Sequence, residues 1–435
     1  MKSLTFQIMA LAIMLLSVTF PAFADTWTDP ETGITWTYTV LNDGTVALGG
    51  GTSSTPAVPK ETEGTIIVPE EVNGLTVTGL MDYAFYNCNV EEIIFDSPFL
   101  RQGKIGKGLF RGCSHLKTIK DLDYLNISKS TSLDEMFSGC SRLTTIDGIG
   151  AWDTSNIISM NETFRGCWSL NEYELAILSL WDTRNLKSLE KTFCECYSLK
   201  DIHFLNSWNV NNLENLYGTF TFCLNLEGGY LDNWSLKRLK DFSNTFELCS
   251  HLGYVCLPNV DFSEVEWMQG TFKGCSSLQI VELGTANYTD GRFPYMYETF
   301  AGCSYLDKVD LSNFKCIMGA YSFGNLRKAF VGCTNLYEVR LPNCIGESKD
   351  YENSYKCIDK GTAESWFKDA LLNETFAGCT NLQKVVGMGL KDNNWEDTYN
   401  EFLRKSTQYS PYDVNFDGSV DISDVVEIVN YVLAQ

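Results

Sequence analysis

The chain has 435 residues, a formal net charge of −22 and a hydrophobic content of 44%. That charge argues against nucleic acid and anionic membranes as partners, because both repel a strongly acidic protein. The hydrophobic content is high enough to build a core, so the 16 cysteines are not needed as the disulfide framework of a small secreted domain.

An export signal is expected over residues 1–24. Lys2 supplies a positive charge, and an apolar run extends from Ile8 to Phe20. The small residues Ala22 and Ala24 stand at the positions that a signal peptidase reads, so cleavage is expected after Ala24. The apolar run is shorter than the roughly 20 residues needed to cross a bilayer. We therefore expect a secreted or cell-surface protein whose mature chain has no membrane span.

Residues 25–80 are expected to form an N-terminal β cap, because the first turn of a repeat array would otherwise expose an apolar face. Within this segment, apolar residues alternate on both sides of an Asn-Asp-Gly turn at 42–44, which predicts a hairpin. Those apolar residues are Trp36, Tyr38, Val40, Val46 and Leu48.

Residues 81–395 repeat the pattern Phe-x-x-Cys-x-x-Leu-x-x-(Ile/Val). Most gaps, such as the 27 residues from Cys113 to Cys140, lie near the leucine-rich-repeat range of roughly 20 to 29. The pattern cysteines are Cys88, Cys113, Cys140, Cys167, Cys196, Cys223, Cys249, Cys275, Cys303, Cys333 and Cys379.

Each unit is predicted to contain a short strand after its cysteine and one or two helical turns before its phenylalanine. The helical expectation comes from apolar residues seven and four positions before the phenylalanine, as at Ile157, Met160 and Phe164. Such a unit buries its apolar edge only against a neighbour, so the chain is predicted to be an α/β leucine-rich-repeat solenoid of about eleven rungs.

These repeats resemble those of BspA-like leucine-rich-repeat surface proteins. The resemblance covers residues 33 to about 390 and is carried by segments such as 152–167 and by the opening segment 64–78. It departs at Cys88, where Val90 stands one residue early. The resemblance implies a secreted or surface-exposed adhesion and protein-interaction protein of host-associated bacteria.

The end of the array is expected to differ from its middle. A charged insertion is predicted at about 346–366, and residues 396–412 are predicted to form a C-terminal cap helix and linker. Residues 413–435 then place oxygen-bearing side chains around Gly418 at the spacing of a calcium loop, so Ca²⁺ is the predicted cofactor. The predicted ligands are Asp413, Asn415, Asp417, Ser419, Asp421 and Asp424.

This tail resembles one calcium-binding half of a type I dockerin, which implies a cohesin-like protein as a partner. Dockerins carry two such halves, whereas this chain has one. The alternative interpretation is an acidic, solvated tail.

The pattern cysteines are interpreted as a buried ladder of reduced thiols, because their constant position in the repeat needs no redox or metal chemistry. The Cys194 and Cys196 pair lacks a second pair to complete a zinc site. Disulfide candidates are the cysteines outside the pattern, with a bond from Cys344 to Cys357 expected to bracket the insertion. These candidates are Cys256, Cys316, Cys344 and Cys357.

The outward residues of the predicted strands are the candidate binding surface. Their mixed charge and aromatic content suit a protein or glycan on host or neighbouring cells, although each position taken alone is also explained as a solvated strand residue. The candidates are Lys120, Asp147, Glu174, His203, Tyr230, Glu282, Asp310 and Arg340, beside Thr118, Thr145, Asp201, Tyr254, Lys308, Glu338 and Lys384.

Two alternatives to an adhesin remain open. The first is a structural component of an extracellular assembly, docked through the calcium tail with the repeats as a spacer. The second is an enzyme, which we do not expect, because the three histidines are scattered and no nucleophile or phosphate-loop motif stands out.

Overall fold

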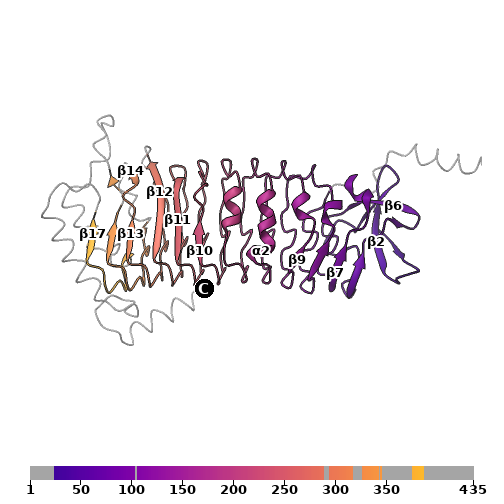
Figure 1. Ribbon diagram of the computed structural model, residues 1–435, viewed down its shortest axis with the longest axis horizontal. Coiled ribbons are helices and arrows are strands. Elements are labelled where there is room, and N and C mark those ends of the chain that lie inside the picture. The colour runs from indigo at the N-terminus through magenta and orange to yellow at the C-terminus, as the bar shows by residue number, and fades with distance from the viewer. Residues whose placement is uncertain are drawn as a thin grey trace, which may run out of the picture.

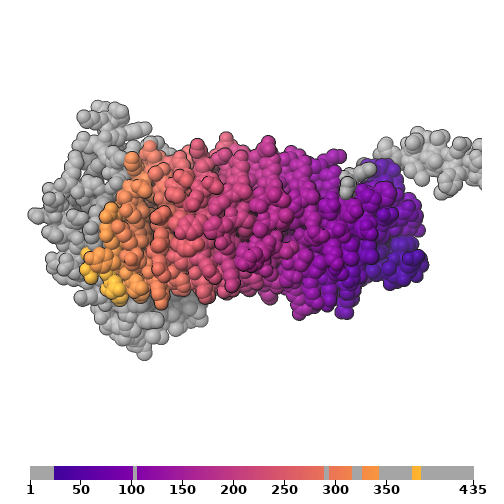
Figure 2. Space-filling model, viewed as in Figure 1, coloured from indigo at the N-terminus to yellow at the C-terminus, as the bar shows by residue number. Residues whose placement is uncertain are grey.

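The computed structural model of the chain describes residues 24–102, 105–288, 293–316, 326–341, 343–344 and 375–386. They form an elongated β-solenoid of about ten turns, stacked in sequence order along the long axis (Figures 1 and 2). The predicted count of eleven rungs stays a prediction, because part of the last turns lies outside the described residues. No helix in the described ranges is long and apolar enough to cross a membrane.

Residues 25–80 form β-structure at one end of the solenoid (Figure 1). The predicted hairpin is confirmed: β2 (Thr35–Val40) and β3 (Val46–Leu48) pair antiparallel. The other strands of their sheet are β1 (Asp25–Thr28), β6 (Leu75–Leu80) and β5 (Glu71–Val72). In contrast, β4 (Gly64–Ile67) pairs in parallel with β7 (Val90–Ile94), so this end shares a sheet with the solenoid.

Most solenoid strands follow their cysteine as predicted and pair in parallel with the next turn. The first sheet continues from β7 through β8 (Thr118–Lys120) and β9 (Thr145–Ile146). A second sheet holds β10 (Gly228–Tyr230), β11 (Tyr254–Asp261), β12 (Ile280–Tyr288), β14 (Phe314–Cys316) and β16 (Asn343–Cys344). A third holds β13 (Lys308–Asp310), β15 (Glu338–Arg340) and β17 (Lys384–Val386).

Short helices lie between β9 and β10. These are η3 (Ile149–Ala151), α2 (Glu172–Leu175), η4 (Ala176–Leu180) and η5 (His203–Ser207), in addition to η1 (Pro98–Gln102) and η2 (Leu122–Tyr124) nearer the N-terminus. Those of the Cys167 and Cys196 units (α2 with η4, and η5) replace the predicted strands. One cause is visible at α2, where the side chain of Asn171 accepts hydrogen bonds from the backbone N–H groups of Tyr173 and Glu174. The chain also has 29 residues from Cys167 to Cys196, against 27 in the preceding turn, which leaves room for a helix.

The predicted helical turns before each phenylalanine are wrong. Alternate backbone N–H groups there donate to carbonyls one turn further on, as from Met160 to Ser188 at 3.1 Å and from Phe164 to Thr192 at 2.9 Å. An α-helix would instead use each N–H for the carbonyl four residues earlier. The apolar residues of the pattern are buried as expected, because this segment packs its side chains inward without being helical.

Aromatic columns run through the core. Adjacent phenylalanine rings stack with centroids 5.3–5.7 Å apart. A second column contains Trp152, Trp181, Trp208 and Trp234, whose indole N–H groups each donate to a carbonyl of the preceding turn. The phenylalanines are Phe85, Phe110, Phe137, Phe164, Phe193, Phe220, Phe246, Phe272, Phe300, Phe330 and Phe376.

The pattern cysteines form the predicted column of buried free thiols. Their contacts differ in one respect from a simple stack of sulfurs, because each thiol from Cys113 onward donates to the carbonyl of a phenylalanine in the preceding turn. The Sγ–O distance is 3.1 Å for Cys140 and Phe110, and 3.0 Å for Cys223 and Phe193. Burial raises the pKa of Cys140 well above the usual thiol value.

A threonine column, which the sequence analysis missed, adds a second set of hydrogen bonds between turns. The hydroxyl of Thr219 lies 2.9 Å from the Leu189 carbonyl and 2.8 Å from the Leu216 carbonyl. The column occupies the position directly before the phenylalanine. Its members with such contacts are Thr163, Thr192, Thr219, Thr245, Thr271, Thr299 and Thr375.

Candidate interaction surface

The eight predicted surface residues share one position, seven residues after the pattern cysteine, but they do not lie on one continuous sheet. Glu174 lies in α2 and His203 in η5, so the strand prediction is wrong for both, while Asp147 directly follows β9. The remaining five lie in strands: Lys120 in β8, Tyr230 in β10, Glu282 in β12, Asp310 in β13 and Arg340 in β15.

Several of the charged candidates are paired within the chain. The Nζ atom of Lys120 lies 2.7 Å from a carboxylate oxygen of Glu92, and the Nε atom of Arg340 lies 2.8 Å from Glu338. Glu174 accepts a hydrogen bond from the backbone N–H of Ile146 at 2.7 Å. The Lys120 side chain holds the pKa of Glu92 below its usual value, with a smaller effect from the Thr65 hydroxyl.

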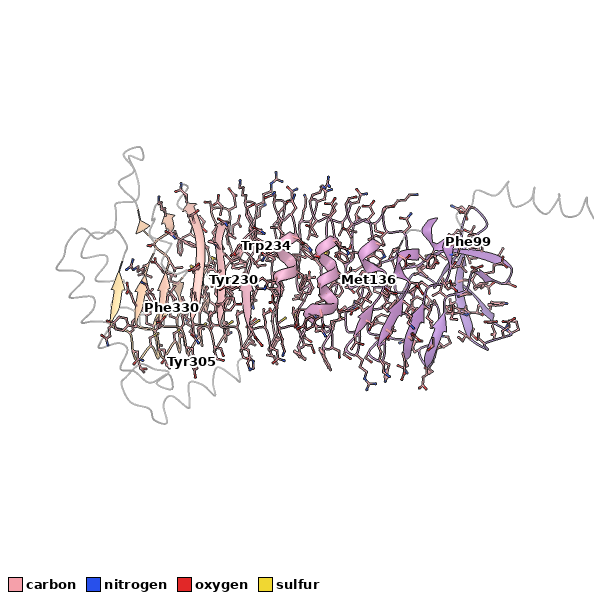
Figure 3. All side chains as sticks on the ribbon, viewed as in Figure 1. Phe99, Met136, Tyr230, Trp234, Tyr305 and Phe330 are labelled. Atoms are coloured by element: carbon pink, nitrogen blue, oxygen red, sulfur yellow. The ribbon has the colours of Figure 1, made fainter. Side chains whose placement is uncertain are left out.

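Three rings come together on consecutive turns, and we call His203, Tyr230 and Tyr254 the aromatic cluster. The ring centroids of Tyr230 and Tyr254 lie 4.4 Å apart with the planes tilted by 42°, and those of His203 and Tyr230 lie 5.8 Å apart. Tyr230 stands on β10 near the middle of the solenoid (Figure 3) and is 37% exposed. Ile280, in register with Tyr254 on the next strand, is exposed as well.

The position of Tyr254 depends on a glycine. A Cβ atom added at Gly228 would lie 2.0 Å from Cζ of Tyr254, so the tyrosine ring covers the bare backbone of the preceding strand. Gly228 and Tyr254 are register partners in the parallel pair β10 and β11. Any larger residue at 228 would displace the ring from its contact with Tyr230.

Carboxylates lie beside the aromatic cluster. Asp201 accepts a hydrogen bond from the backbone N–H of His203 at 2.7 Å and also contacts the His203 ring. Burial raises the pKa of Tyr254, and the nearby Tyr230, Asp201 and Glu227 act in the same direction. The rings therefore stand next to negative charge, on a surface reached by solvent.

Cys256 occupies the surface column between Tyr230 and Glu282, which the sequence analysis missed. The three are register partners across β10, β11 and β12, and Cys256 stands seven residues after Cys249, so counting from the pattern cysteine finds it. Cys256 is a free, buried thiol, so its proposed role in a disulfide is wrong. Burial and the nearby Glu282 carboxylate raise its pKa to about 11.

The helical turns next to the cluster expose further apolar side chains. Tyr173 is 83% exposed and Leu180 is 67% exposed, on α2 and η4 respectively. Ile177 lies against the backbone of the preceding turn, where a Cβ atom added at Gly150 would be 2.6 Å from its side chain. Exposed apolar side chains on neighbouring elements are candidates for an interaction surface. The sequence analysis did not identify these exposed side chains, because it predicted a strand where α2 and η4 lie.

More than half of the chain matches one known protein family. Three overlapping segments, residues 106–227, 169–284 and 214–335, match the family described as "Mycoplasma protein of unknown function, DUF285". Together they span residues 106–335, more than half of the 435-residue chain. The chain belongs to the DUF285 family. The aromatic cluster lies inside the matched region. No curated protein matches the chain.

Solved structures of leucine-rich-repeat proteins resemble this DUF285 chain at low identity. A leucine-rich cell surface protein of Faecalibacterium prausnitzii is 16% identical, with 87% of this chain and 98% of that chain covered and a TM-score of 0.36. A leucine-rich repeat protein of Bacteroides ovatus is 17% identical, with coverage of 75% and 89% and a TM-score of 0.28. An internalin of Listeria monocytogenes is 13% identical, with coverage of 68% and 88% and a TM-score of 0.21.

Several predicted features of this DUF285 protein lie outside the described residues. They are the export signal up to residue 23, the insertion at 346–366, the cap helix and linker at 396–412, and the calcium loop from Asp413 to Asp424. The side chains of Cys316, Cys344 and Cys357 are likewise outside, so the predicted disulfide is not addressed. The part of the chain that is described contains no group of three or more His, Cys, Asp or Glu side chains placed to hold a metal ion.

Proposed function

We propose that the protein is secreted or held at the cell surface and binds a partner on host or neighbouring cells through the aromatic cluster and the adjoining sheet face. The observation that carries this proposal is the contact of His203, Tyr230 and Tyr254 on consecutive turns, with Ile280 exposed beside them. Tyrosine gives a large contact area for little loss of side-chain entropy, and it is common among residues that dominate binding energy.

The scaffold supports binding by preorganisation. Stacked turns held by backbone, threonine and cysteine hydrogen bonds fix the positions of the surface rings before a partner arrives, which lowers the entropy cost of association. A role in binding rather than catalysis is favoured because the side chains of His203 and Asp201 are 54% and 47% exposed. Catalytic acids and bases commonly need an environment shielded from water to tune their pKa values.

The test measures binding of the mature chain to immobilised host matrix and to intact bacteria. The double variant Tyr230→Ala and Tyr254→Ala should lower affinity by about tenfold or more, equivalent to about 1.4 kcal/mol or more. The matched control is Trp168→Ala with Tyr197→Ala, which removes another stacked ring pair, the exposed Trp168 on the half-buried Tyr197, with centroids 5.6 Å apart, outside the cluster. A loss in the control and none in the cluster variant would show that the wrong surface has been chosen.

We also propose, from the spacing of the ligands alone, that residues 413–424 bind one Ca²⁺ ion and that the tail can dock the protein into an extracellular assembly through a cohesin-like partner. A hard cation takes six to eight oxygen ligands, and the predicted loop supplies carboxylates at the required spacing around Gly418. Deleting residues 411–435 should then abolish docking while leaving binding through the aromatic cluster unchanged.

A further inference from the structure

The aromatic cluster differs from the charged positions of the sheet face because the contact from Tyr230 to Tyr254 joins two uncharged rings. Elsewhere the same columns hold charged pairs between turns, such as Lys120 with Glu92 and Lys308 with Glu338. In the cluster, the residue in register before Tyr254 is Gly228, and the ring of Tyr254 lies over it against Tyr230. The rings of Tyr230 and Tyr254 therefore form a two-ring platform, in which the Tyr254 ring packs directly on the backbone of Gly228.

Hydrogen-bond acceptors surround this platform. Asp201 stands five residues after its cysteine, at the repeat position that Gly228 and Tyr254 occupy in the next two turns. It contacts His203, and its charge and that of Glu227 act on Tyr254. Glu282 lies on the other side, separated from Tyr230 by the buried Cys256. Each carboxylate can accept hydrogen bonds from two hydroxyl groups of a ligand.

We propose that the aromatic cluster is a carbohydrate-binding platform that stacks an uncharged pyranose ring on Tyr230 and Tyr254, with Asp201 accepting hydrogen bonds from its hydroxyls. A sugar ring has a C–H face that packs on the electron-rich face of an aromatic ring, and hydroxyls at its edge that donate to carboxylates. The proposal rests on the binding function proposed above and names the class of its ligand.

The charge of the surface decides which sugars fit. Sulfated, sialylated and uronic-acid glycans carry negative charge, and the carboxylates of Asp201 and Glu227 on a protein of net charge −22 repel them. A protein partner is less favoured, because Asp and Glu are depleted at the core of protein interfaces, whereas here they adjoin the rings.

The direct test is calorimetric titration of the mature protein with cellohexaose, mannohexaose and maltohexaose, and with heparin as the anionic comparison. We expect at least one neutral hexasaccharide to bind and heparin not to bind. Tyr230→Ala and Tyr254→Ala should each weaken binding at least about tenfold, while Tyr254→Phe should retain it, because stacking needs the ring and not the hydroxyl. Gly228→Ala should also weaken binding by displacing the Tyr254 ring.

Two controls separate the possible outcomes. Trp168→Ala with Tyr197→Ala should leave sugar binding unchanged, and the melting temperature of every variant shows whether it is folded. If no neutral hexasaccharide binds, or heparin alone binds, the carbohydrate proposal is wrong. If binding to cells is nevertheless lost in the cluster variants, the proposed binding function stands with a protein partner. If cell binding is unaffected as well, both proposals fail.

Discussion

At the scale of single residues, a cysteine column and a shorter threonine column connect successive turns. In seven repeats a threonine hydroxyl and a cysteine thiol flank the stacked phenylalanine and donate to carbonyls of the preceding turn, as Thr219 and Cys223 do on either side of Phe220. A buried carbonyl left without a donor costs about 1–3 kcal/mol. This is a physical reason for a polar donor at both positions rather than a larger apolar residue.

The buried thiols predict a loss of stability in alkaline solution. Burial raises the folded pKa of Cys140 and Cys167 well above the usual value of 9.0, while unfolded thiols ionise near that value. Above pH 9 the unfolded state therefore binds fewer protons than the folded state. The free energy of unfolding is unaffected by these thiols below that pH and falls as the pH rises toward their folded pKa values.

Urea unfolding at pH 8, 9 and 10 with reductant measures this slope. Cys140→Ala with Cys167→Ala should be less stable than the natural chain at pH 8. Its stability should also fall less steeply above pH 9, by about 1.4 kcal/mol per pH unit for each thiol removed. Equal slopes in the two proteins would contradict the assignment of these groups as protonated, buried thiols.

At the scale of elements, the same repeat position forms a strand in some turns and a helix in others. The position seven residues after the pattern cysteine lies in strands β8 and β10 at Lys120 and Tyr230. The same position lies in helices α2 and η5 at Glu174 and His203. At α2 the turn has two additional residues and the Asn171 cap, whereas the turn of η5 has neither. The phenylalanine and cysteine columns continue through both turns.

The cap of α2 is directly testable. Asn171→Ala removes the acceptor for the N–H groups of Tyr173 and Glu174 and should destabilise the protein by about 1 kcal/mol. Asn171→Asp, the matched control, keeps a capping oxygen and should cost much less. Chemical denaturation of the three proteins gives the comparison, and equal stability of Asn171→Ala and the natural chain would show that the cap does not contribute.

At the scale of the whole molecule, the core columns stabilise the solenoid, whereas the aromatic cluster on its surface is the proposed binding site. The phenylalanine and cysteine columns run along the whole described array, whereas the aromatic cluster occupies three turns. Because each turn contacts mainly its neighbours, the surface of one stretch can change without altering the rest. The aromatic cluster and the predicted calcium tail are therefore expected to act independently.

Calcium binding by the tail is the prediction at this scale. Calorimetry on the full mature chain should detect one Ca²⁺ ion, and Asp413→Ala with Asp424→Ala should abolish the heat, because two of the predicted carboxylate ligands are lost. Asp413→Asn with Asp424→Asn, which keeps the size and part of the oxygen ligation, should bind more weakly. Undiminished binding in the alanine variant would remove the predicted site.

The sequence alone determined the repeat, the buried cysteine column, the burial of the repeat phenylalanines and the hairpin at 42–44, because each depends on spacing along the chain. Only the tertiary structure decided where the backbone hydrogen bonds run. They join one turn to the next, which a pattern with helical spacing such as Ile157, Met160 and Phe164 could not reveal. The aromatic cluster was likewise hidden, because its rings come from three separate turns and meet only through the register that sets Tyr254 over Gly228.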